Sequence, residues 1–456
     1  MSTRPNTYFI DNRTPKGSAG NIHMYSIPFD KSQITFELPP GLRGTVVKSR
    51  RVPPLADVAA GIQGALAQPV GSPPLRELAV PGDKVCIIFT DITRATPDHL
   101  LVPSLLTELE MAGVRSQDVT LLCGTGMHRP STPAEKVTKL SQAVVDRYRV
   151  VDHEPQNPAA LVDLGTTESG IPISVNRLVY EADLAIATGI VEPHHLAGYS
   201  GGRKTLAVGA GGEAMIAATH GPQMVDHPGT RLGRIERNPF HEALTEAAKR
   251  AGLRFILNVV SDDDKRIVAV RAGEPTETLL ELVAIAKNLY EVPIPHQYDL
   301  AVAGVGFPKD QNLYQASRAA SYLFFAPTPV VRPGGCIILP APCPEGAGQG
   351  AGEQRYYATM KRAVDASVDA STLLDELRRT GYPPGAQRAF FMAKVLEKNP
   401  VIVVGAKSPD IVRDLHMIPA VDMDEAFRIA TQKLGHTDLD VLIVPHALFT
   451  LPIVQG

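Results

Sequence analysis

Histidines gather in short polar segments of this 456-residue chain, and most of these segments follow a run of apolar residues. His128 lies in GTGMHRPST, His194 and His195 are adjacent in VEPHHLAG, and His220 lies in AATHGPQ. An imidazole with a pKa near 6.5 takes up and releases protons close to neutral pH, and its neutral form binds divalent transition metals. A single histidine is most often a core or surface residue, but this concentration predicts acid–base or metal chemistry.

A glycine-rich segment follows the histidine pair and reads GYSGGRKTLAVGAGG. Gly201 and Gly202 allow a ligand to approach the backbone closely, and Lys204 resembles the lysine of a phosphate-binding loop. The segment misses the nucleoside-triphosphatase pattern G-x-x-x-x-G-K-[ST], because Arg203 occupies the position directly before the lysine. From these residues alone the segment is either a loop that binds a nucleotide phosphate or a tight turn with a solvated lysine.

Asp91 and Arg94 follow another apolar run, in the segment TDITRATP. An arginine on a rigid turn binds a carboxylate or a phosphate through two parallel hydrogen bonds, which lysine does less well. The alternative interpretation is a local ion pair between Asp91 and Arg94 beside a helix that starts at Thr96 and Pro97.

Continuous apolar runs recur along the chain with helix-like stretches between them, which predicts strands that are covered on both faces. The runs expected to form strands are 85–90, 119–123, 183–188, 255–260, 300–303, 336–339, 401–405 and 441–444. Ligands of open α/β sheets bind beyond the carboxyl ends of the strands, and several of the polar segments stand there. The sequence therefore predicts an α/β protein whose chemistry gathers at one edge of a parallel sheet.

Composition narrows the partners of the protein. The 45 Lys+Arg and 48 Asp+Glu give a formal net charge of −3, and no basic run offers a surface for nucleic acid or for an anionic membrane. No stretch approaches the ~18 apolar residues of a membrane span, and the N-terminus lacks the apolar core of a signal peptide, so we expect a cytoplasmic protein. The four scattered cysteines are expected to be core residues without a disulfide or metal role.

The length favours two domains, each with a mainly parallel sheet flanked by helices, and an active site in the cleft between them. Two prolines interrupt a helix-like segment at 291–298 (EVPIPHQY), which we interpret as a linker. The predicted domains are an N-terminal cofactor-binding and catalytic domain of residues 1–290 and a C-terminal α/β domain of residues 299–456 that closes the cleft. The first 50 residues have the character of a loosely packed hairpin.

Five motifs together resemble the nickel-pincer lactate racemase family. In chain order they are DITRATP at 91–97, GTGMHR at 124–129, PH at 193–194 with GYSGGRK at 198–204, His220, and DQNLYQ at 310–315. Their order and spacing are those of the family over about residues 85–320. A single motif of this kind is weak evidence, but five in sequence make the resemblance specific.

The resemblance implies an isomerase, a racemase or epimerase of 2-hydroxy acids, that carries a nickel-pincer nucleotide. This cofactor is pyridinium-3,5-bisthiocarboxylic acid mononucleotide with bound Ni(II), built by dedicated biosynthetic enzymes, and the family can join it covalently at the position of Lys204. By resemblance His220 is the protein's nickel ligand, and Asp91, Gly201 and Gly202 contact the cofactor.

By the same resemblance, His128 and His194 form the acid–base pair. The positions implied to bind the small-molecule substrate are Arg94, Tyr314, Gln315 and Arg318. Lactate racemase has a lysine where this chain has Arg318, and a planar guanidinium binds two oxygens at once, so we expect a 2-hydroxy acid other than lactate. We assign no role to His195 or to His446.

Hydride transfer explains why such a reaction needs two histidines. The α-hydrogen of a 2-hydroxy acid is too weakly acidic for imidazole to remove, because the neighbouring carboxylate is already negative. If it leaves as a hydride while a histidine takes the hydroxyl proton, a planar 2-keto acid forms, and reduction on its other face inverts the centre. The alternatives are a hydrolase in which His128, His194 and His220 hold a metal ion, and a nucleotide carrier without catalysis.

Overall fold

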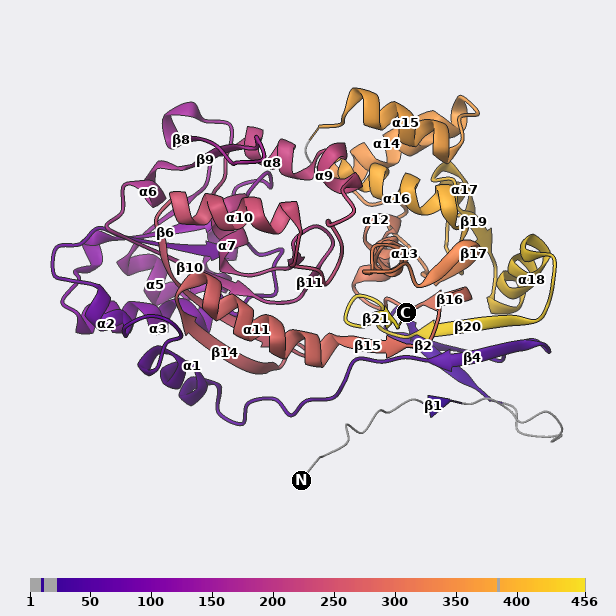
Figure 1. Cartoon of the computed structure of the whole chain (residues 1–456), viewed down its shortest axis with the longest axis horizontal. Helices are drawn as coiled ribbons and strands as arrows, with labels where there is room; N and C mark the ends of the chain where they lie inside the picture. Colours follow the sequence, from indigo (N-terminus) through magenta and orange to yellow (C-terminus); the bar gives the residue numbers. More distant parts are fainter. Residues whose placement is uncertain (1–9, 12–22, 384–385, 456) are drawn as a thin grey trace. The chain divides into compact units, whose positions relative to one another are not determined.

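A computed structural model describes residues 10–11, 23–383 and 386–455 of the chain, which form two compact units (Figure 1). The central unit is the continuous segment Arg51–Leu289. The terminal unit combines Met1–Arg50 with Tyr290–Gly456, and each unit contains its own sheet.

The central unit is built on a six-stranded sheet in the order β14-β13-β10-β5-β6-β7. Five neighbouring strands are parallel, and β14 at one edge is antiparallel to β13. The strands are β5 (Val85–Thr90), β6 (Val119–Gly124), β7 (Arg149–Asp152), β10 (Leu184–Ile190), β13 (Leu253–Ser261) and β14 (Ile267–Gly273). The four strands predicted in this part of the sequence are confirmed.

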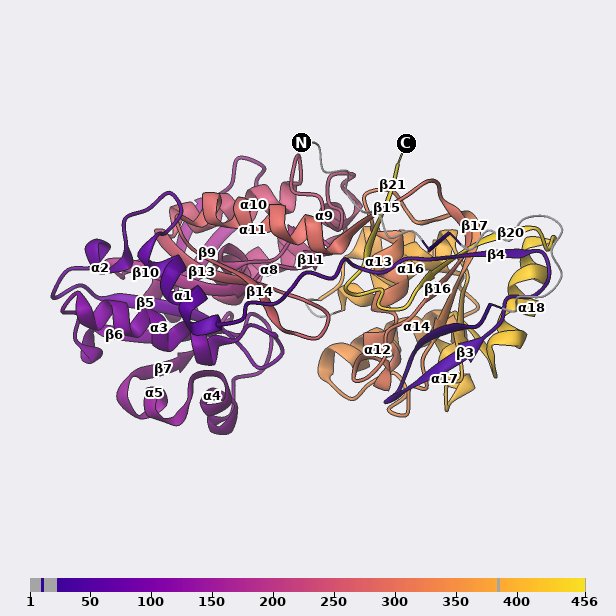
Figure 2. The ribbon, with the colours of Figure 1, turned by 90° about the horizontal axis from the view of Figure 1, so that it is seen from below.

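Helices cover both faces of this sheet, which explains why every residue of β5 and β10 is buried. On one face Ile87 and Phe89 pack in a core with Leu101 and Leu105 of α3 (Asp98–Met111). On the other face α7 (Gly202–Lys204) and α10 (Pro239–Arg250) pack against β13 (Figure 2).

The remaining elements of the central unit are shorter or peripheral. The helices are α1 (Val58–Ala67), α2 (Leu75–Leu78), α4 (Pro133–Leu140), α5 (Gln142–Arg147), α6 (Arg177–Tyr180), α8 (Glu213–His220), α9 (Pro222–Asp226) and α11 (Pro275–Tyr290), with the 3-10 turns η1 (Ser116–Asp118) and η2 (Pro158–Ala160) and the π-helical turn η3 (Thr205–Gly209). Two small antiparallel pairs are β8 (Leu161–Thr166) with β9 (Pro172–Asn176) and β11 (Pro193–His194) with β12 (Gly198–Tyr199).

The terminal unit has a seven-stranded sheet in the order β1-β4-β20-β16-β17-β18-β19, parallel except for β1. Its strands are β1 (Ile10–Asp11), β4 (Leu42–Val46), β16 (Tyr298–Ala303), β17 (Val331–Pro340), β18 (Val401–Val404), β19 (Ile418–Ala420) and β20 (Leu439–Val444). Its helices are α12 (Leu313–Ala316), α13 (Arg318–Phe324), α14 (Ala351–Asp365), α15 (Ala370–Thr380), α16 (Gln387–Lys398), α17 (Pro409–Asp414) and α18 (Met423–Leu434), with the 3-10 turn η4 (Lys309–Gln311). The predicted α/β class and its parallel-dominated sheets are confirmed for both units.

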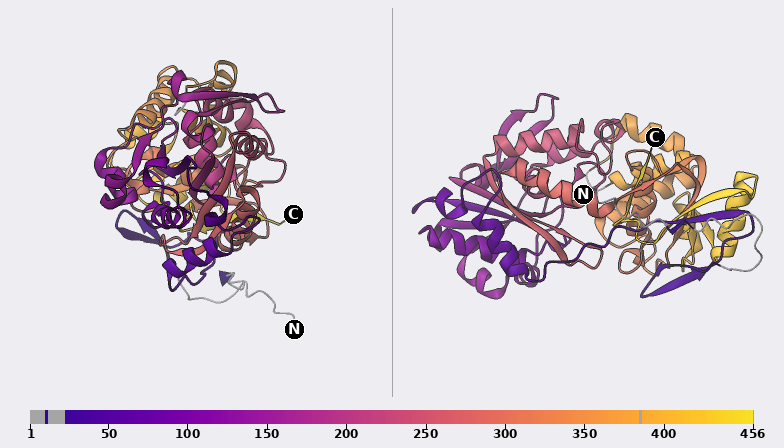
Figure 3. Two further views of the ribbon diagram at one scale, coloured as in Figure 1. Left: turned by 90° about the vertical axis from the view of Figure 1, so that its left-hand side faces the viewer. Right: turned by 60° about the horizontal axis from the view of Figure 1, so that its bottom comes forward.

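The described residues before Arg51, predicted as part of the N-terminal domain, belong instead to the terminal unit. Strand β4 pairs in parallel with β20, a contact between residues about 400 positions apart in the chain (Figures 2 and 3). The hairpin of β2 (Tyr25–Phe29) and β3 (Ser32–Phe36) contributes Tyr25 and Phe36 to the core around Phe427, so it is not loosely packed. Alternating local patterns predict such a hairpin but not the distant sheet that receives it.

The predicted linker at 291–298 is only partly a linker. The unit boundary falls between Leu289 and Tyr290, but β15 (Glu291–Ile294) pairs in parallel with β21 (Leu451–Val454), near the end of the chain. Proline is compatible with such a two-stranded ribbon. Both strands are edge strands, and the backbone N–H that proline lacks is not needed on the side that faces away from the partner strand.

Two composition-based expectations can be compared with the fold. All four cysteines are buried and free of disulfides, as expected. Within residues 10–11, 23–383 and 386–455, no helix is long and apolar enough to cross a membrane.

Candidate active site

The turns after three adjacent strands of the central unit form the candidate site. Strands β10, β5 and β6 are parallel neighbours, so their carboxyl ends lie at one edge of the sheet. Asp91 and Arg94 follow β5, His128 follows β6, and His194 follows β10 on the short strand β11. The sheet order therefore brings together residues as far apart in sequence as Asp91 and His194.

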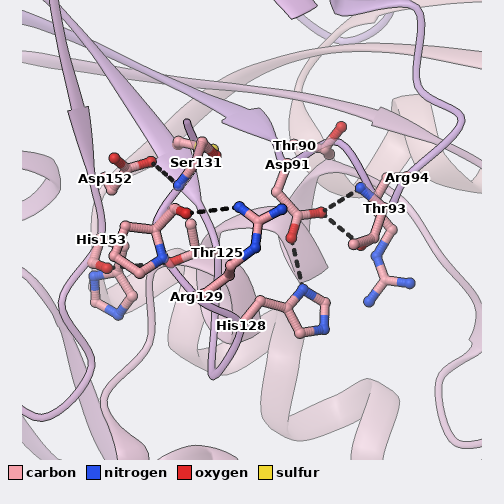
Figure 4. Close-up of polar contacts among 12 residues, drawn as sticks. Thr90, Asp91, Thr93, Arg94, Thr125, His128, Arg129, Ser131, Asp152 and His153 are labelled. Carbon is pink, nitrogen blue, oxygen red and sulfur yellow. Dashed lines mark hydrogen bonds and ion pairs between the residues drawn. The ribbon is translucent and has the colours of Figure 1, made fainter. Parts of the chain in front are cut away.

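The Asp91 carboxylate orients His128 (Figure 4). Asp91 Oδ2 lies 2.6 Å from His128 Nδ1, while Oδ1 accepts hydrogen bonds from the Thr93 hydroxyl at 2.6 Å and the Thr93 backbone N–H at 3.2 Å. Burial acts to raise the pKa of Asp91, but the bonds from His128 and Thr93 and the charge of Arg94 outweigh it and lower the pKa. An ionised Asp91 fixes the proton of a neutral His128 on Nδ1, which leaves Nε2 as the basic nitrogen.

Arg94 extends from the same turn with its side chain exposed. Among the residues that the structure describes, its guanidinium has no hydrogen-bond or ion-pair partner, and α3 begins at Asp98 without a side-chain cap. The alternative of an Asp91–Arg94 ion pair beside a capped helix is therefore wrong. The turn instead holds Arg94 available for an anion.

A buried ion pair beneath this turn was not predicted from the sequence. Lys139 on α4 lies 2.7 Å from Asp98, and the two side chains are 6% and 0% exposed. The ammonium also donates to the backbone carbonyls of Thr96 at 2.8 Å and Arg94 at 3.3 Å. Because α4 follows the His128 turn, Lys139 ties that turn to the one that carries Asp91 and Arg94.

The Asp98 carboxylate of this pair also has further hydrogen-bond partners. Its carboxylate accepts from the hydroxyls of Thr90 at 2.6 Å and Thr188 at 2.5 Å, at the ends of β5 and β10. No sequence motif marks Lys139 or Asp98, since each sits in an ordinary helical pattern. Only the packing of the elements shows that they meet.

His194 differs from His128 in its hydrogen bonding. Its Nδ1 accepts from the backbone N–H groups of Ala197 at 3.1 Å and Leu196 at 3.3 Å, so a neutral ring carries its proton on Nε2. Burial lowers the pKa of His194 well below its usual value, and the charges of Lys204, His195, His220 and Arg94 add to the effect. His194 is therefore a neutral donor in this arrangement. His195 is itself buried.

Lys204 lies among these groups at the end of α7. Burial, supported by the charge of Arg94, lowers the pKa of Lys204 to about 7, although Glu192 and Asp91 act in the opposite direction. An amine with such a pKa is substantially unprotonated at neutral pH and is nucleophilic. The side chain of Lys204 is partly exposed, and its lowered pKa favours a reactive amine over an ordinary solvated lysine.

His220 ends α8 with its ring held in a defined tautomer. Its Nδ1 lies 3.0 Å from the carbonyl oxygen of Ile216, one turn earlier, and the ring meets Phe240 edge to face at 5.2 Å between centroids. Burial and the Lys204 charge lower the pKa of His220 to about 4. A neutral imidazole with Nδ1–H bonded to a carbonyl presents Nε2 as a lone pair, the form that binds a transition metal. The residues thus fit a nickel cofactor bound at Lys204 and His220.

The glycines of the site permit close packing of backbone. A Cβ on Gly202 would lie 2.9 Å from Ile256 and 3.2 Å from Asn258, and one on Gly201 would lie 2.7 Å from Leu279. Gly201 and Gly202 therefore let α7 sit directly on the sheet, and their predicted contact with the cofactor stays a prediction. Asn258 is fully buried, and neither polar atom of its side chain has a hydrogen-bond partner within the described part of the chain.

The GTG motif before His128 has a similar packing role. A Cβ on Gly124 would lie 3.1 Å from the Thr205 carbonyl oxygen, and Gly126, at φ +54°, donates its N–H to Gly209 at 2.9 Å. The turn after β6 thus rests on the π-helical turn η3 that follows Lys204. Single π-helical turns are frequent at functional sites, and here one joins the His128 and Lys204 segments.

The other predicted substrate residues lie in the terminal unit, around α12 and α13. The Asn312 side chain caps α12 by accepting from the backbone N–H of Gln315 at 3.0 Å. Gln315 Oε1 is buried and has no donor among the described residues. Arg318 donates to the hydroxyl of Tyr322 at 3.1 Å. Tyr314, Gln315 and Arg318 are thus brought together on one segment, with polar groups that a ligand can use.

A three-histidine metal site does not form. In the part of the chain that the structure describes, the one group of His, Cys, Asp or Glu side chains whose ligand atoms all approach within 4.8 Å is Asp262–Asp264, on a different turn. His128, His194 and His220 do not converge on one point, so the hydrolase alternative is not favoured. The separate tautomers of the three rings lead to the same conclusion.

These features define a two-unit α/β protein with acid–base groups and a reactive amine at the carboxyl edge of a parallel sheet. Two family models match the chain, the Lactate racemase N-terminal domain over residues 29–233 and the Lactate racemase C-terminal domain over residues 296–451. The lactate racemase of Thermoanaerobacterium thermosaccharolyticum is 31% identical over 422 residues, which are 92% of this chain and 96% of that protein. The lactate racemase of Lactiplantibacillus plantarum is 31% identical over 388 residues, 85% and 89% of the two chains.

Solved structures agree with this relationship. The lactate racemase apoprotein from Thermoanaerobacterium thermosaccharolyticum superposes with a TM-score of 0.83 at 30% identity, covering 95% of this chain and all of that one. A Thermotoga maritima protein that is 21% identical, with a TM-score of 0.60 over 84% of this chain and 96% of its own, shares the fold. The chain therefore belongs to the lactate racemase family, and it is an isomerase.

Proposed function

We propose that the protein racemises or epimerises a 2-hydroxy acid by reversible hydride transfer with a nickel-pincer nucleotide. The observation that carries the proposal is the pair of histidines after β6 and β10, the two strands on either side of β5. His128 has Nε2 basic, and His194, near the amine of Lys204, has Nε2 protonated. Membership in the lactate racemase family supports the reaction class.

His128 is the residue prepared to take the hydroxyl proton of the substrate. When Nε2 accepts that proton the ring becomes an imidazolium, and the Asp91 carboxylate at 2.6 Å stabilises the new charge. Asp91 therefore acts on catalysis through His128, which adds to its proposed contact with the cofactor.

His194 begins as a hydrogen-bond donor to the oxygen at the reacting carbon. To take a proton from the opposite enantiomer it must adopt the other neutral tautomer, with the proton on Nδ1, and give up the bonds from Leu196 and Ala197. Those two bonds, at 3.3 Å and 3.1 Å, have to break for this change. The two histidines then serve the two orientations of the hydroxyl group.

When bound, the cofactor would supply the hydride-acceptor chemistry that the side chains of this protein lack. Lys204 would hold it through its amine, and His220 Nε2 would complete the nickel coordination. Arg94 would bind the substrate carboxylate, while Tyr314, Gln315 and Arg318 would contact the rest of the substrate. The enzymes that build the cofactor are the expected partners of this chain.

Isotope labelling of the holoenzyme tests hydride transfer directly. Racemisation of a 2-deuterated 2-hydroxy acid in ordinary water should retain the deuterium at carbon 2, and the active protein should hold one nickel per chain with a visible absorption band. Washout of deuterium into water, or full activity of nickel-free protein, would contradict the proposal.

Single turnovers separate the roles of the two histidines. Because the two enantiomers of a substrate with one stereocentre are equally stable, kcat/KM must be equal in the two directions, so steady-state rates cannot distinguish them. In acid-quenched single turnovers, His128→Gln and His194→Gln should each form 2-keto acid from one enantiomer only, and from opposite ones. The same residual enantiomer in both variants would refute the two-base assignment.

A further inference from the structure

A buried histidine outside the proposed catalytic pair lies at the same edge of the central sheet. His153 comes directly after β7, the parallel neighbour of β6, and it is only 2% exposed. Its Nε2 lies 2.9 Å from the carbonyl oxygen of Gly211, and its Nδ1 lies 3.0 Å from Nδ2 of Asn176. Because both ring nitrogens are bonded to the protein, this ring is not a catalytic residue.

The hydrogen bonds of Asn176 fix the tautomer of the His153 ring. Asn176 Oδ1 accepts from the backbone N–H of Leu178 at 3.0 Å, so its side-chain nitrogen faces His153 and donates to Nδ1. The proton of the neutral ring is therefore on Nε2, which donates to Gly211. Burial lowers the pKa of His153, although the Gly211 bond and the charge of Glu154 oppose the shift, so the ring is neutral near pH 7.

The carbonyl group that accepts this proton lies in the short segment that joins η3 to α8. A Cβ on Gly211 would lie 2.1 Å from the Ala207 carbonyl oxygen, so the backbone follows a path that is too tight for a side chain. The next residue, Gly212, donates its N–H to the Ser174 carbonyl oxygen at 2.9 Å. Because α8 is a helix of about two turns, the place where it starts determines where His220 lies at its end.

The backbone of His153 contacts the turn that carries His128 (Figure 4). The Thr125 hydroxyl donates to the carbonyl oxygen of His153 at 3.1 Å. The Thr125 carbonyl oxygen accepts in turn from the backbone N–H of His128 at 3.0 Å, which closes that turn. One buried residue therefore bonds both to the turn of the proposed base and to the segment that leads to the proposed nickel ligand, His220.

Packing alone does not require a histidine at this position. An apolar side chain of similar size would fill the same space without the cost of removing two polar nitrogens from water. The ring offsets that cost by bonding both nitrogens, and it also fixes a geometry, since an acceptor has to lie along the Nε2–H direction. The bond thus sets the separation between the end of β7 and the start of α8.

We infer that His153 is a positioning residue, which holds His220 in place for nickel through the bond to the Gly211 carbonyl and keeps the His128 turn beside it. The inference rests on the proposed function, in which His220 binds nickel and His128 takes a proton. The bonds of His153 involve protein groups alone, so their effect is measurable in the apoprotein as well as in the nickel-loaded enzyme.

Two replacements of His153 separate the two bonds of the ring. The amide of His153→Gln reaches the position of Nε2 and donates to Gly211, whereas the shorter amide of His153→Asn reaches only the position of Nδ1 and keeps the contact with Asn176. Hydrogen–deuterium exchange of the apoprotein should be at least about 10-fold faster in the peptide 205–220 for His153→Asn, and within about 3-fold of wild type for His153→Gln. Release of nickel from the holoenzyme to a chelator should be about 10-fold faster for His153→Asn alone.

Controls separate the Gly211 bond from general stability. Tyr148→Phe removes the 2.6 Å hydrogen bond between the Tyr148 hydroxyl and Glu110, next to β7. Its midpoint of thermal unfolding should fall by about 2–4 °C, as for His153→Asn, without faster exchange in the peptide 205–220 or faster nickel release. Asn176→Ala removes the partner of Nδ1 and keeps the Gly211 bond, so its nickel release should stay within about 3-fold of wild type.

Each other outcome has a distinct meaning. Equal exchange and equal nickel release in His153→Asn and His153→Gln, whether unchanged or both faster, overturn this inference and leave the proposed function standing. Fast nickel release from Asn176→Ala does the same, and that measurement remains decisive even if His153→Asn does not fold. A wild type that holds no nickel after co-production with the cofactor-building enzymes overturns the proposed function and, with it, the ligand role of His220.

Discussion

Two lysines of the central unit, one buried and one partly buried, show how the same side chain serves structure in one place and is proposed to serve chemistry in another. Lys139 lies 2.7 Å from Asp98 and donates to three further oxygens, those of Thr90, Thr96 and Arg94. Lys204 has no hydrogen-bond partner for its amine among the described residues, and its pKa is lowered to about 7. A buried cation with a full set of acceptors holds a turn in place, whereas the environment of an amine without them favours the neutral, reactive form.

Replacement of Lys204 should give the largest effect and sharpen the comparison. Lys204→Met removes the only amine proposed to hold the cofactor. The variant should therefore show no turnover, and it should hold no nickel after gel filtration. The apoprotein should become more stable by about 1–2 kcal/mol at pH 7, because a partly buried amine without a hydrogen-bond partner is replaced by an apolar side chain. Lys249→Met, at an exposed position of α10, is the matched control. A destabilised Lys204→Met apoprotein would break the comparison.

Replacement of Lys139 should act in the opposite direction. Lys139→Met leaves the Asp98 carboxylate buried without its cation, and we expect a loss of about 3–5 kcal/mol in the free energy of unfolding, measured by urea titration. The double variant Lys139→Met with Asp98→Asn should recover part of this loss.

Lys136 offers the matched control for that experiment. It lies on the same helix, 2.7 Å from Asp152, with both side chains partly exposed at 18% and 14%. Lys136→Met should cost about 1 kcal/mol or less. Equal losses of unfolding free energy in Lys136→Met and Lys139→Met would show that the buried pair contributes no more to stability than the partly exposed pair.

The Asp91–His128 contact should have a smaller effect that appears in rate and not in stability. Asp91→Asn removes the charge that stabilises a protonated His128, and we expect kcat to fall about 10- to 100-fold with nickel content unchanged. Parallel losses of nickel and activity would indicate that Asp91 acts mainly on the cofactor.

The titration of Lys204 is the prediction with the smallest expected effect. In the apoprotein, acylation of this amine, followed by mass spectrometry, should have a midpoint near pH 7. Its folded pKa lies below the unfolded value of 10.5, so its stabilising contribution is complete above about pH 10.5 and is lost as the pH falls toward 7. The difference in stability between wild type and Lys204→Met should therefore widen over that interval. A labelling midpoint near pH 10 would show that the pKa of Lys204 is that of an ordinary lysine and would contradict the prediction.

Much of the sheet architecture follows from local sequence. The continuous apolar runs at 85–90 and 119–123 form β5 and β6 almost to the residue, because strands buried on both faces need apolar side chains at every position. The first 50 residues were misassigned because β4 reaches its partner β20 across nearly the whole chain, and pairing at that distance leaves no local pattern.

In the candidate site, too, some features follow from the sequence and others only from the fold. The residue types and the order of the motifs were sufficient to select His128, His194, Lys204 and His220, since few side chains can move protons or bind nickel. Their tautomers and the lowered pKa of Lys204 depend on which backbone groups and charges surround them. His153 carries no motif, and its proposed role follows only from the hydrogen bonds that join it to two segments of the site.

The sequence by itself determined the chemistry that is available to this protein, because histidine, lysine and arginine at strand ends have intrinsic acid–base and anion-binding properties. Only the tertiary structure decided which of these groups are paired. A carboxylate 2.7 Å from Lys139 makes this lysine structural, whereas the Lys204 amine has no such partner among the described residues and is proposed to hold the cofactor. The physical reason is that burial penalises a charge wherever it occurs, but the compensating partner comes from another part of the chain.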